Sequence, residues 1–420
     1  MCRMILKHSL SIFRFFAVLL LVSSATLTAP EALAADCGGT RAEIVVKVEA
    51  GHSVDEILAA YPVQRAGPLL ESHRLFLLRA TDPRYCGTNQ WSDKLADTLK
   101  HHPAVNYAES DLRTDLSDGR FHAWPDGDPD DAGTDPLTWT SQPAVTQLRL
   151  GDAHKISRGA GAVVAVLDTG VEATHPALAG RLLPGYDYVD DDSTPQEMTN
   201  GVDDDADGAI DESYGHGTFV SGTVALVAPE AKIIPMRVLD SDGRGNAPVV
   251  AEAIDDAVAS GADVINMAFG SPLKPLNNRL RDAIKRARQH GVVVVASAGN
   301  EGGQEESYPA AMVECIAVGA ETADRQGWAS FSNRGSWVDV TAPGTAIVGP
   351  FPGGRYARWN GTSVAAPLVS GQAALIVTAH PTLDAGKVTA AITKTATMVK
   401  PPSADKMYEI NVPRSFTTTG

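Results

Sequence analysis

The sequence predicts an α/β protein whose larger part is a parallel sheet covered by helices on both faces, preceded by a small α+β module. Two observations predict this architecture. From about residue 140 onward, short apolar runs rich in β-branched residues alternate with amphipathic stretches, which is typical of repeated βαβ units. Before residue 110 the chain reads strand, helix, strands, helix, strand, the order of a split βαβ, ferredoxin-like unit. The 420 residues leave room for about two or three compact units.

Residues 1–35 are expected to be a signal peptide. Basic residues occur within 3–14, an unbroken apolar run follows at 15–22, and residues 32–34 (Ala-Leu-Ala) have the small-x-small pattern of a cleavage site. A membrane-spanning helix needs ~20 apolar residues. We therefore expect no membrane anchor and an exported protein, secreted outside the cell or into a periplasm.

Residues 36–110 form the predicted α+β domain. Ser53 and Ser92 each stand where a helix N-cap is expected. The expected strands are 44–48, 75–78 and 105–108, and the expected helices are 54–61 and 93–101.

Residues 111–139 are expected to be an acidic linker, because Asp, Gly and Pro dominate the segment and cannot build a core. The formal net charge is −16, and the acidic residues are concentrated in two stretches: nine lie within 109–135 and eleven within 187–212. An acidic chain of this kind excludes a general nucleic-acid-binding surface.

Residues 140–420 form the predicted parallel-sheet domain. We expect its functional residues at the carboxyl ends of the strands, where open α/β sheets bind their ligands. The expected strands are 162–167, 232–239, 263–269 and 292–297, and the expected helices include 249–260, 276–290 and 364–379.

Three short motifs stand at strand ends or helix starts: Asp168-Thr169-Gly170, Gly215-His216-Gly217-Thr218 and Gly361-Thr362-Ser363. Each alone is more often a turn, a loop or a helix cap. Together they place an acid, a histidine and a serine in the chain order of subtilisin-type enzymes. A histidine can take the proton of a serine hydroxyl, and a carboxylate can hold the imidazole in the right tautomer.

On these motifs the chain resembles the subtilisin-like serine peptidases, or subtilases, over roughly residues 135–400. The resemblance implies a subtilisin-like three-layer catalytic domain, with Asp168, His216 and Ser363 hydrolysing proteins or peptides through an acyl-enzyme. It also implies that residues 36–110 resemble the family's propeptide, which inhibits a zymogen until it is cut away. Further matching segments are 165–171, 227–229, 237–240 and 360–367.

The same resemblance implies that Asn300, after the strand 292–297, stabilises the oxyanion together with the backbone N–H of the nucleophile. The alternative is a simple turn residue before Gly302. Substrate would pair with the edge formed by Ala268, Phe269 and Gly270, and Ala298 and Gly299 would line the pocket before the scissile bond. Two further readings stay open: Phe269 as ordinary core, and Glu301 at the rim favouring a basic side chain.

Three departures from the family pattern stand out. Val364 replaces the usual methionine after the nucleophile, which nearly conserves volume. Phe219 stands where a histidine is common and is expected to pack its helix. The segment between Gly222 and Val227 is short, so the family's tight calcium loop there is expected to be missing.

A different calcium site is conceivable in the acidic stretch before His216. Its alternating carboxylates and turn glycine suit Ca²⁺, but an EF-hand is excluded because Tyr214 occupies its twelfth position. A merely solvated acidic loop explains the pattern equally well. The candidate ligands are Asp203, Asp205, Asp207 and Asp211. No cofactor is otherwise required.

Four cysteines are present, and Cys2 leaves with the signal peptide. Cys37 and Cys86 flank the N-terminal module and could pair in an oxidising compartment. Cys315 lies in an apolar run and is expected to be a small buried hydrophobe.

Two function classes remain. The first is a secreted serine endopeptidase, acting as a monomer with its own propeptide as inhibitor. The second is a catalytically inactive peptide-binding or scaffold protein on the same fold. An inactive homologue is expected to lose at least one of the four expected catalytic residues. All four are present in this chain: Asp168, His216, Asn300 and Ser363.

Overall fold

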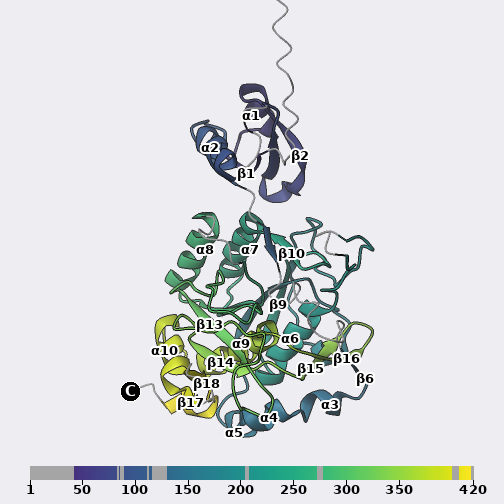
Figure 1. The fold of residues 1–420 in the computed structure, drawn as a ribbon, viewed down its shortest axis with the longest axis vertical. Helices are drawn as coiled ribbons and strands as arrows, with labels where there is room; N and C mark the ends of the chain where they lie inside the picture. Colours follow the sequence, from purple (N-terminus) through teal and green to yellow (C-terminus); the bar gives the residue numbers. More distant parts are fainter. Residues whose placement is uncertain are drawn as a thin grey trace, which may run out of the picture.

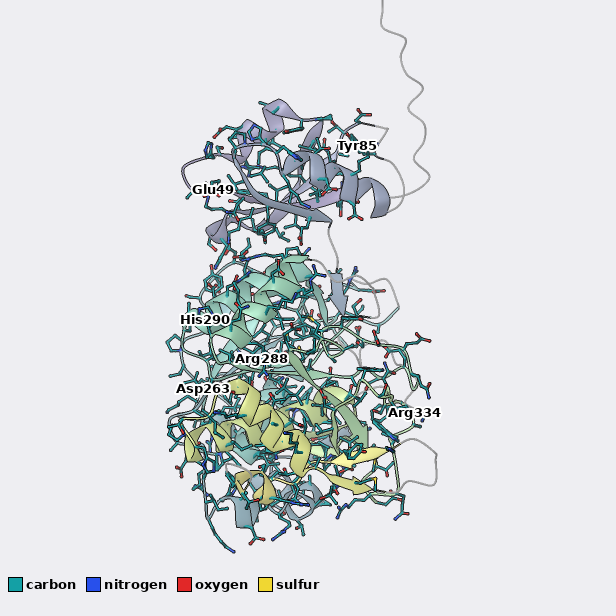
Figure 2. The ribbon with its side chains drawn as sticks, turned by 90° about the vertical axis from the view of Figure 1, so that its left-hand side faces the viewer. Glu49, Tyr85, Asp263, Arg288, His290 and Arg334 are labelled. Carbon is teal, nitrogen blue, oxygen red and sulfur yellow. The ribbon has the colours of Figure 1, made fainter. Side chains whose placement is uncertain are left out.

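The computed structural model describes residues 42–82, 85, 89–110, 113–115, 130–203, 208–271, 278–399 and 406–417. They form two bodies, the N-terminal module (residues 42–110) and the main unit (residues 130–417), one above the other (Figure 1). In the view turned by 90°, Glu49 and Tyr85 mark the module, and Asp263, His290 and Arg334 mark the main unit (Figure 2).

The module is a four-stranded sheet of order β2-β3-β1-β4 with two helices. β1 pairs antiparallel with β3 and β4, as a split βαβ unit requires. Ser53 caps α1 in a capping box, as predicted. Ser92 lies inside α2, which begins about one turn earlier, so its predicted cap is wrong. The elements are β1 (Glu43–Val48), α1 (Val54–Ala60), β2 (Val63–Leu70), η1 (Glu71–His73), β3 (Leu75–Ala80), α2 (Asn89–Leu99) and β4 (Val105–Ser110).

The main unit is built on a nine-stranded sheet of order β17-β18-β14-β13-β12-β11-β7-β9-β8. All its pairings are parallel except β17 with β18. All four strands predicted from β-branched runs are present, each ending within two residues of its expected end. The strands are β7 (Val163–Asp168), β8 (Tyr186–Asp187), β9 (Lys232–Arg237), β11 (Val264–Met267), β12 (Val293–Ser297), β13 (Cys315–Glu321), β14 (Val340–Pro343), β17 (Thr397–Val399) and β18 (Met407–Glu409).

Helices cover both faces of this sheet, which gives three layers. Along β7, Val164 and Val166 belong to the same core cluster as residues of α6, α9 and α10, whereas Ala165 and Leu167 belong to the cluster of α7 and α8. This alternation is what a doubly covered strand requires. The helices are α6 (His216–Val227), α7 (Ala247–Ala259), α8 (Asn278–Gln289), α9 (Thr362–Ala379) and α10 (Ala385–Thr395).

The segment expected to be a featureless linker carries two short strands. β5 (Arg113–Asp115) pairs antiparallel with β10 (Arg244–Asn246), and β6 (Asp130–Gly133) pairs antiparallel with β16 (Arg355–Trp359). β16 also pairs with β15 (Ile347–Phe351). Low apolar content predicted the lack of a core here but not the backbone pairing, which needs no apolar side chain. Short helices α3 (Pro136–Thr140), α4 (Pro143–Gln147) and α5 (Leu150–Ala153) follow β6, and 3-10 helices η3 (Pro176–Leu178) and η4 (Pro413–Thr417) complete the unit.

Among the described helices, α9 alone is long and apolar enough to cross a membrane, but 83% of it is buried inside the protein as a core helix. Cys315 is buried and unpaired, as predicted, and burial raises the pKa of its thiol. The expected signal peptide and both Cys37 and Cys86 lie outside the described residues.

The module packs on the helices α7 and α8 of the main unit (Figure 1). Apolar side chains from one face of its sheet join the cluster that contains these helices; they are Val45, Leu70, Leu75 and Leu77. Around this patch, polar groups meet across the boundary. Lys47 forms an ion pair with Glu252 of α7, and His73 Nε2 lies 2.8 Å from Asp256 Oδ2.

Candidate active site

The residues of the three motifs gather at the carboxyl edge of the main sheet. Asp168 is the last residue of β7, and Asn300 follows the end of β12 by three residues. His216 is the first residue of α6, and Ser363 is the second of α9. Hydrogen bonds from His216 to Asp168 and from Thr362 to Asn300 bring the first turns of α6 and α9 to this edge.

Asp168 and His216 are directly hydrogen-bonded in the core. Asp168 Oδ1 lies 2.7 Å from His216 Nδ1, and their side chains are 1% and 0% exposed. The backbone N–H of Thr169 also donates to Asp168 Oδ1, at 2.8 Å. A carboxylate only accepts hydrogen bonds, so the Nδ1 atom of His216 carries the proton and Nε2 carries the lone pair.

Asn300 is joined to the start of the serine helix. Its Oδ1 accepts from both the backbone N–H and the hydroxyl of Thr362, each at 2.9 Å. The hydroxyl of Thr362 accepts in turn from the backbone N–H of Gly299, at 3.1 Å. These bonds fix the Asn300 amide with its oxygen on Thr362, so its NH₂ group is left to donate elsewhere.

Trp359 forms one wall beside the histidine, which the sequence analysis missed. Its ring lies edge-on to His216, with ring centroids 5.4 Å apart. Phe219 also packs against Trp359, as expected of a residue that packs its helix, and shares a buried cluster with Val364. The only available signal was a tryptophan directly before the Asn-Gly-Thr-Ser motif.

Residues 268–270 continue from β11 past the carboxyl edge, and Ser271 then bridges to Tyr308 with backbone hydrogen bonds of 2.8 and 2.9 Å. The side chain of Phe269 is fully buried in the core, so this residue can meet a substrate only through its backbone. Ala268 is likewise buried, and Gly270 closes the segment.

Ala298 and Gly299 line the space beyond β12. A side chain at Gly299 would lie 2.6 Å from atoms of both Glu301 and Asn333, and its φ is +101°. Glycine is therefore required here, because these two side chains occupy the place of a Cβ atom and the φ is positive. Asn333 donates to the carboxylate of Glu301 at 2.6 Å, which places an exposed negative charge at the rim.

β10 is the second element that the sequence analysis missed. It pairs with β5, an extended segment of the chain itself, in the register Arg244↔Asp115, Gly245↔Thr114 and Asn246↔Arg113. β10 therefore has an edge that holds an extended segment, here β5, by backbone pairing. Its three residues give too short a run to predict a strand from periodicity.

The acidic stretch before α6 uses its carboxylates to close its own loop. Asp203 accepts from the N–H of Gly208 at 3.0 Å. Asp211 accepts from the N–H groups of Asn200 and Gly201 at 2.8 and 2.9 Å. Asp205 and Asp207 lie outside the described residues. Within the described part of the chain, no three His, Cys, Asp or Glu side chains gather as a metal site.

A buried Asp–His pair and a serine helix at one edge of a doubly covered parallel sheet define a serine peptidase of the subtilisin type. The subtilase family matches residues 159–409, more than half of the chain, and the chain belongs to that family. It is a serine endopeptidase, a hydrolase.

Individual relatives agree with this membership. The chain is 39% identical to thermitase of Thermoactinomyces vulgaris over 272 residues, covering 62% of this chain and 90% of thermitase. It is 38% identical to subtilisin E of Bacillus subtilis over 267 residues, covering 60% and 65%. Its fold matches fervidolysin from Fervidobacterium pennivorans, described as a keratinolytic enzyme related to subtilisin, with a TM-score of 0.67 and 24% identity over 90% of this chain and 61% of that one.

Proposed function

We propose that Asp168, His216 and Ser363 form the catalytic triad of this endopeptidase. The observation that carries the proposal is the buried 2.7 Å contact between Asp168 Oδ1 and His216 Nδ1, which directs the lone pair of Nε2 away from the carboxylate. Nε2 takes the proton of the Ser363 hydroxyl as its oxygen attacks the carbonyl carbon of the scissile bond. The imidazolium then gives that proton to the leaving amine, and water cleaves the acyl-enzyme by the same route.

The NH₂ group of Asn300 and the backbone N–H of Ser363 are the proposed oxyanion donors. Thr362 holds the oxygen of the Asn300 amide, so the donor is oriented before substrate arrives. A preorganised donor is effective because it requires no rearrangement while negative charge develops.

The proposed substrate lies extended between β10 and residues 268–270. The pairing of β5 with β10 supports this, because it shows that the β10 edge accepts an antiparallel strand. Ala298 and Gly299 are the proposed lining of the pocket for the side chain before the scissile bond, and Glu301 and Asn333 lie against Gly299.

The chain is proposed to be a secreted zymogen whose module, residues 36–110, inhibits the catalytic domain. Self-cleavage is expected within residues 108–140, after removal of residues 1–35. Two features support this: the module is docked on α7 and α8, and β5 follows it directly onto the β10 edge. The proposed active form is a monomer that acts on proteins or peptides.

Replacing Ser363 with alanine tests the triad and maturation together. Ser363→Ala is expected to lower peptide hydrolysis by several orders of magnitude, because triad members act as a unit, and to accumulate the uncut chain. The matched control is Ser370→Ala on the same helix, which removes a buried hydroxyl bonded to Asn266. Hydrolysis at the wild-type rate in Ser363→Ala would contradict the triad. Normal processing of that variant, made alone in a protease-deficient host, would contradict self-cleavage.

Calcium at the acidic loop is a separate proposal. Bound Ca²⁺ stabilises only the folded chain, so chelation is expected to lower the melting temperature. Replacing both Asp205 and Asp207 with Asn is expected to remove that sensitivity. A melting temperature that is indifferent to calcium and to chelator contradicts the site.

A further inference from the structure

A buried carboxylate next to the triad takes no part in the mechanism described above. Glu197, 5% exposed, lies between β8 and α6. Its Oε1 accepts from the hydroxyl of Thr169 at 2.6 Å and from the N–H of Gly215 at 3.0 Å. Its Oε2 accepts from the N–H and the hydroxyl of Thr218 at 3.0 and 2.8 Å.

The direction of these hydrogen bonds is fixed by two backbone amides. The N–H of Gly217 donates to the Thr169 hydroxyl oxygen at 2.9 Å, and the N–H of Glu172 donates to the Thr218 hydroxyl oxygen at 2.8 Å. An amide can only donate, so each hydroxyl oxygen accepts there. The Thr169 hydroxyl lies 2.6 Å from Glu197 Oε1 and 3.4 Å from Asp168 Oδ1, so its proton points at Glu197, the nearer acceptor, as the proton of Thr218 does. All four partners of Glu197 therefore donate to it, which is the pattern of an ionised carboxylate.

Burial raises the pKa of Glu197 above its ordinary value, and the donors, which stabilise the anion, oppose that effect in part. The titratable groups that face it are Asp168 and Tyr214, whose charges interact with that of Glu197, and His216 on the adjacent first turn of α6. Its negative charge also lies at the N-terminus of the twelve-residue α6, where the helix dipole favours an anion.

Glu197 touches both segments that carry the Asp–His pair. Through Thr169 it holds the turn after β7, whose own N–H donates to Asp168. Through Gly215 and Thr218 it holds the residues on either side of His216. The two segments are closely packed, since a side chain at Gly217 would lie 2.2 Å from the carbonyl oxygen of Gly170.

We propose that Glu197 is a positioning residue: its anionic carboxylate joins the Asp168 turn to the first turn of α6, sets the geometry of the Asp168–His216 pair, and stabilises the imidazolium that forms during acyl transfer. This inference rests on the proposed triad. It adds a second carboxylate to the site, one that contacts neither substrate nor the reacting atoms.

Glu197→Gln is the direct test, measured on the mature enzyme with a peptide substrate. Glutamine has nearly the same shape as glutamate. Its NH₂ group, however, cannot accept hydrogen bonds from the two donors that face one of the carboxylate oxygens. Misplacement of catalytic groups is expected to lower kcat by up to about 10²-fold with little change in KM. The acid limb of the kcat/KM profile is expected to move to lower pH, because loss of a nearby negative charge weakens proton binding by His216. Glu197→Asp, which keeps the charge, is expected to keep the acid limb in place.

Glu172→Gln is the matched control. Its carboxylate is bonded to the N–H groups of Gly353 and Gly354, at 3.0 and 3.3 Å, and not to the residues of the triad turns. Its kcat and pH profile are expected to be those of the wild type.

A purely structural role makes a different prediction: Glu197→Gln would lower the melting temperature while the folded enzyme kept wild-type kcat and pH profile, and that result overturns the proposal.

If Glu197→Gln does not fold, Thr169→Val is measured in its place. This variant cuts the link to the Asp168 turn but keeps the charge, so kcat is expected to fall about tenfold with the acid limb unmoved, and an unchanged kcat overturns the proposal. Activity in Ser363→Ala would instead refute the triad itself, so the two failures are distinguishable.

Discussion

Two contacts between helices and their neighbours differ sharply in this molecule: the contact of α6 with α9 inside the main unit, and the contact of α7 with the N-terminal module. Neither α6 nor α9 contains an Asp, Glu, Lys or Arg residue, and every residue of α6 is buried. At their crossing, a side chain at Gly371 would lie 2.5 Å from the Cβ atom of Val227. This contact is buried, free of charged residues and close.

The contact of α7 with the module combines the apolar patch with charged groups. Glu252, 4% exposed, pairs with Lys47 and accepts from the Tyr107 hydroxyl and from Arg279, each at 3.2 Å. Charged groups can be solvated again when two surfaces separate, whereas an apolar helix contact has no such alternative. The difference agrees with the proposal that the module is cut away and released, whereas the α6–α9 pair stays within the main unit.

The largest effect is expected at Glu252 in the contact of α7 with the module. Glu252→Ala leaves Lys47 and Arg279 without their shared partner, and truncating one member of a buried ion pair weakens binding by about 2–5 kcal/mol. Inhibition of the mature enzyme by its cleaved module is therefore expected to weaken by at least about thirtyfold. The control is Glu56→Gln in the module, which changes an exposed pair with His52. An unchanged inhibition constant for Glu252→Ala would mean that the apolar patch alone holds the module.

A smaller effect is expected in the permanent contact. Gly371→Ala forces a methyl group against Val227, and overpacking of a core destabilises by about 1–3 kcal/mol. Thermal unfolding in the Ser363→Ala background measures this change without self-digestion. Gly386→Ala on the exposed start of α10, where the new Cβ would lie 3.2 Å from a side-chain oxygen of Asp384, is the control. Equal stability of the two variants would show that α6 and α9 can separate without penalty.

The smallest effect is the pH dependence of module binding. The hydrogen bond to Asp256 raises the pKa of His73 above its ordinary value of 6.5, so the bound state holds the proton more tightly than the free module. The His73–Asp256 contribution is complete below pH 6.5 and is lost as the pH rises through the raised pKa. Inhibition is expected to weaken by a few-fold from pH 6 to pH 9, since partly exposed ion pairs contribute about 1 kcal/mol or less. His73→Gln should flatten that trend, and an equally steep trend in this variant would assign it to another group.

Much of the fold and of the site could be predicted from local sequence. β7 and β12 are β-branched runs that no helix would favour, and the motifs containing Asp168, His216 and Ser363 follow or open such elements. The features that local sequence could not give depend on distant partners. β10 is a strand because β5 lies beside it, and Glu197 is buried because Thr169 and Thr218 surround it with donors; neither has a periodic signal of its own.

The strands β5 and β6 have a kinetic consequence. Each is paired to the main unit on its own, β5 with β10 and β6 with β16, so the chain between them is tethered at both ends to the domain that is proposed to cut it. Such a tether gives the peptide bond that is to be cleaved a high effective concentration at the proposed active site. The first cut is then first order: its half-life is expected to be the same in dilute and concentrated solutions of the zymogen, and only later cleavages of other chains should accelerate as the protein is concentrated.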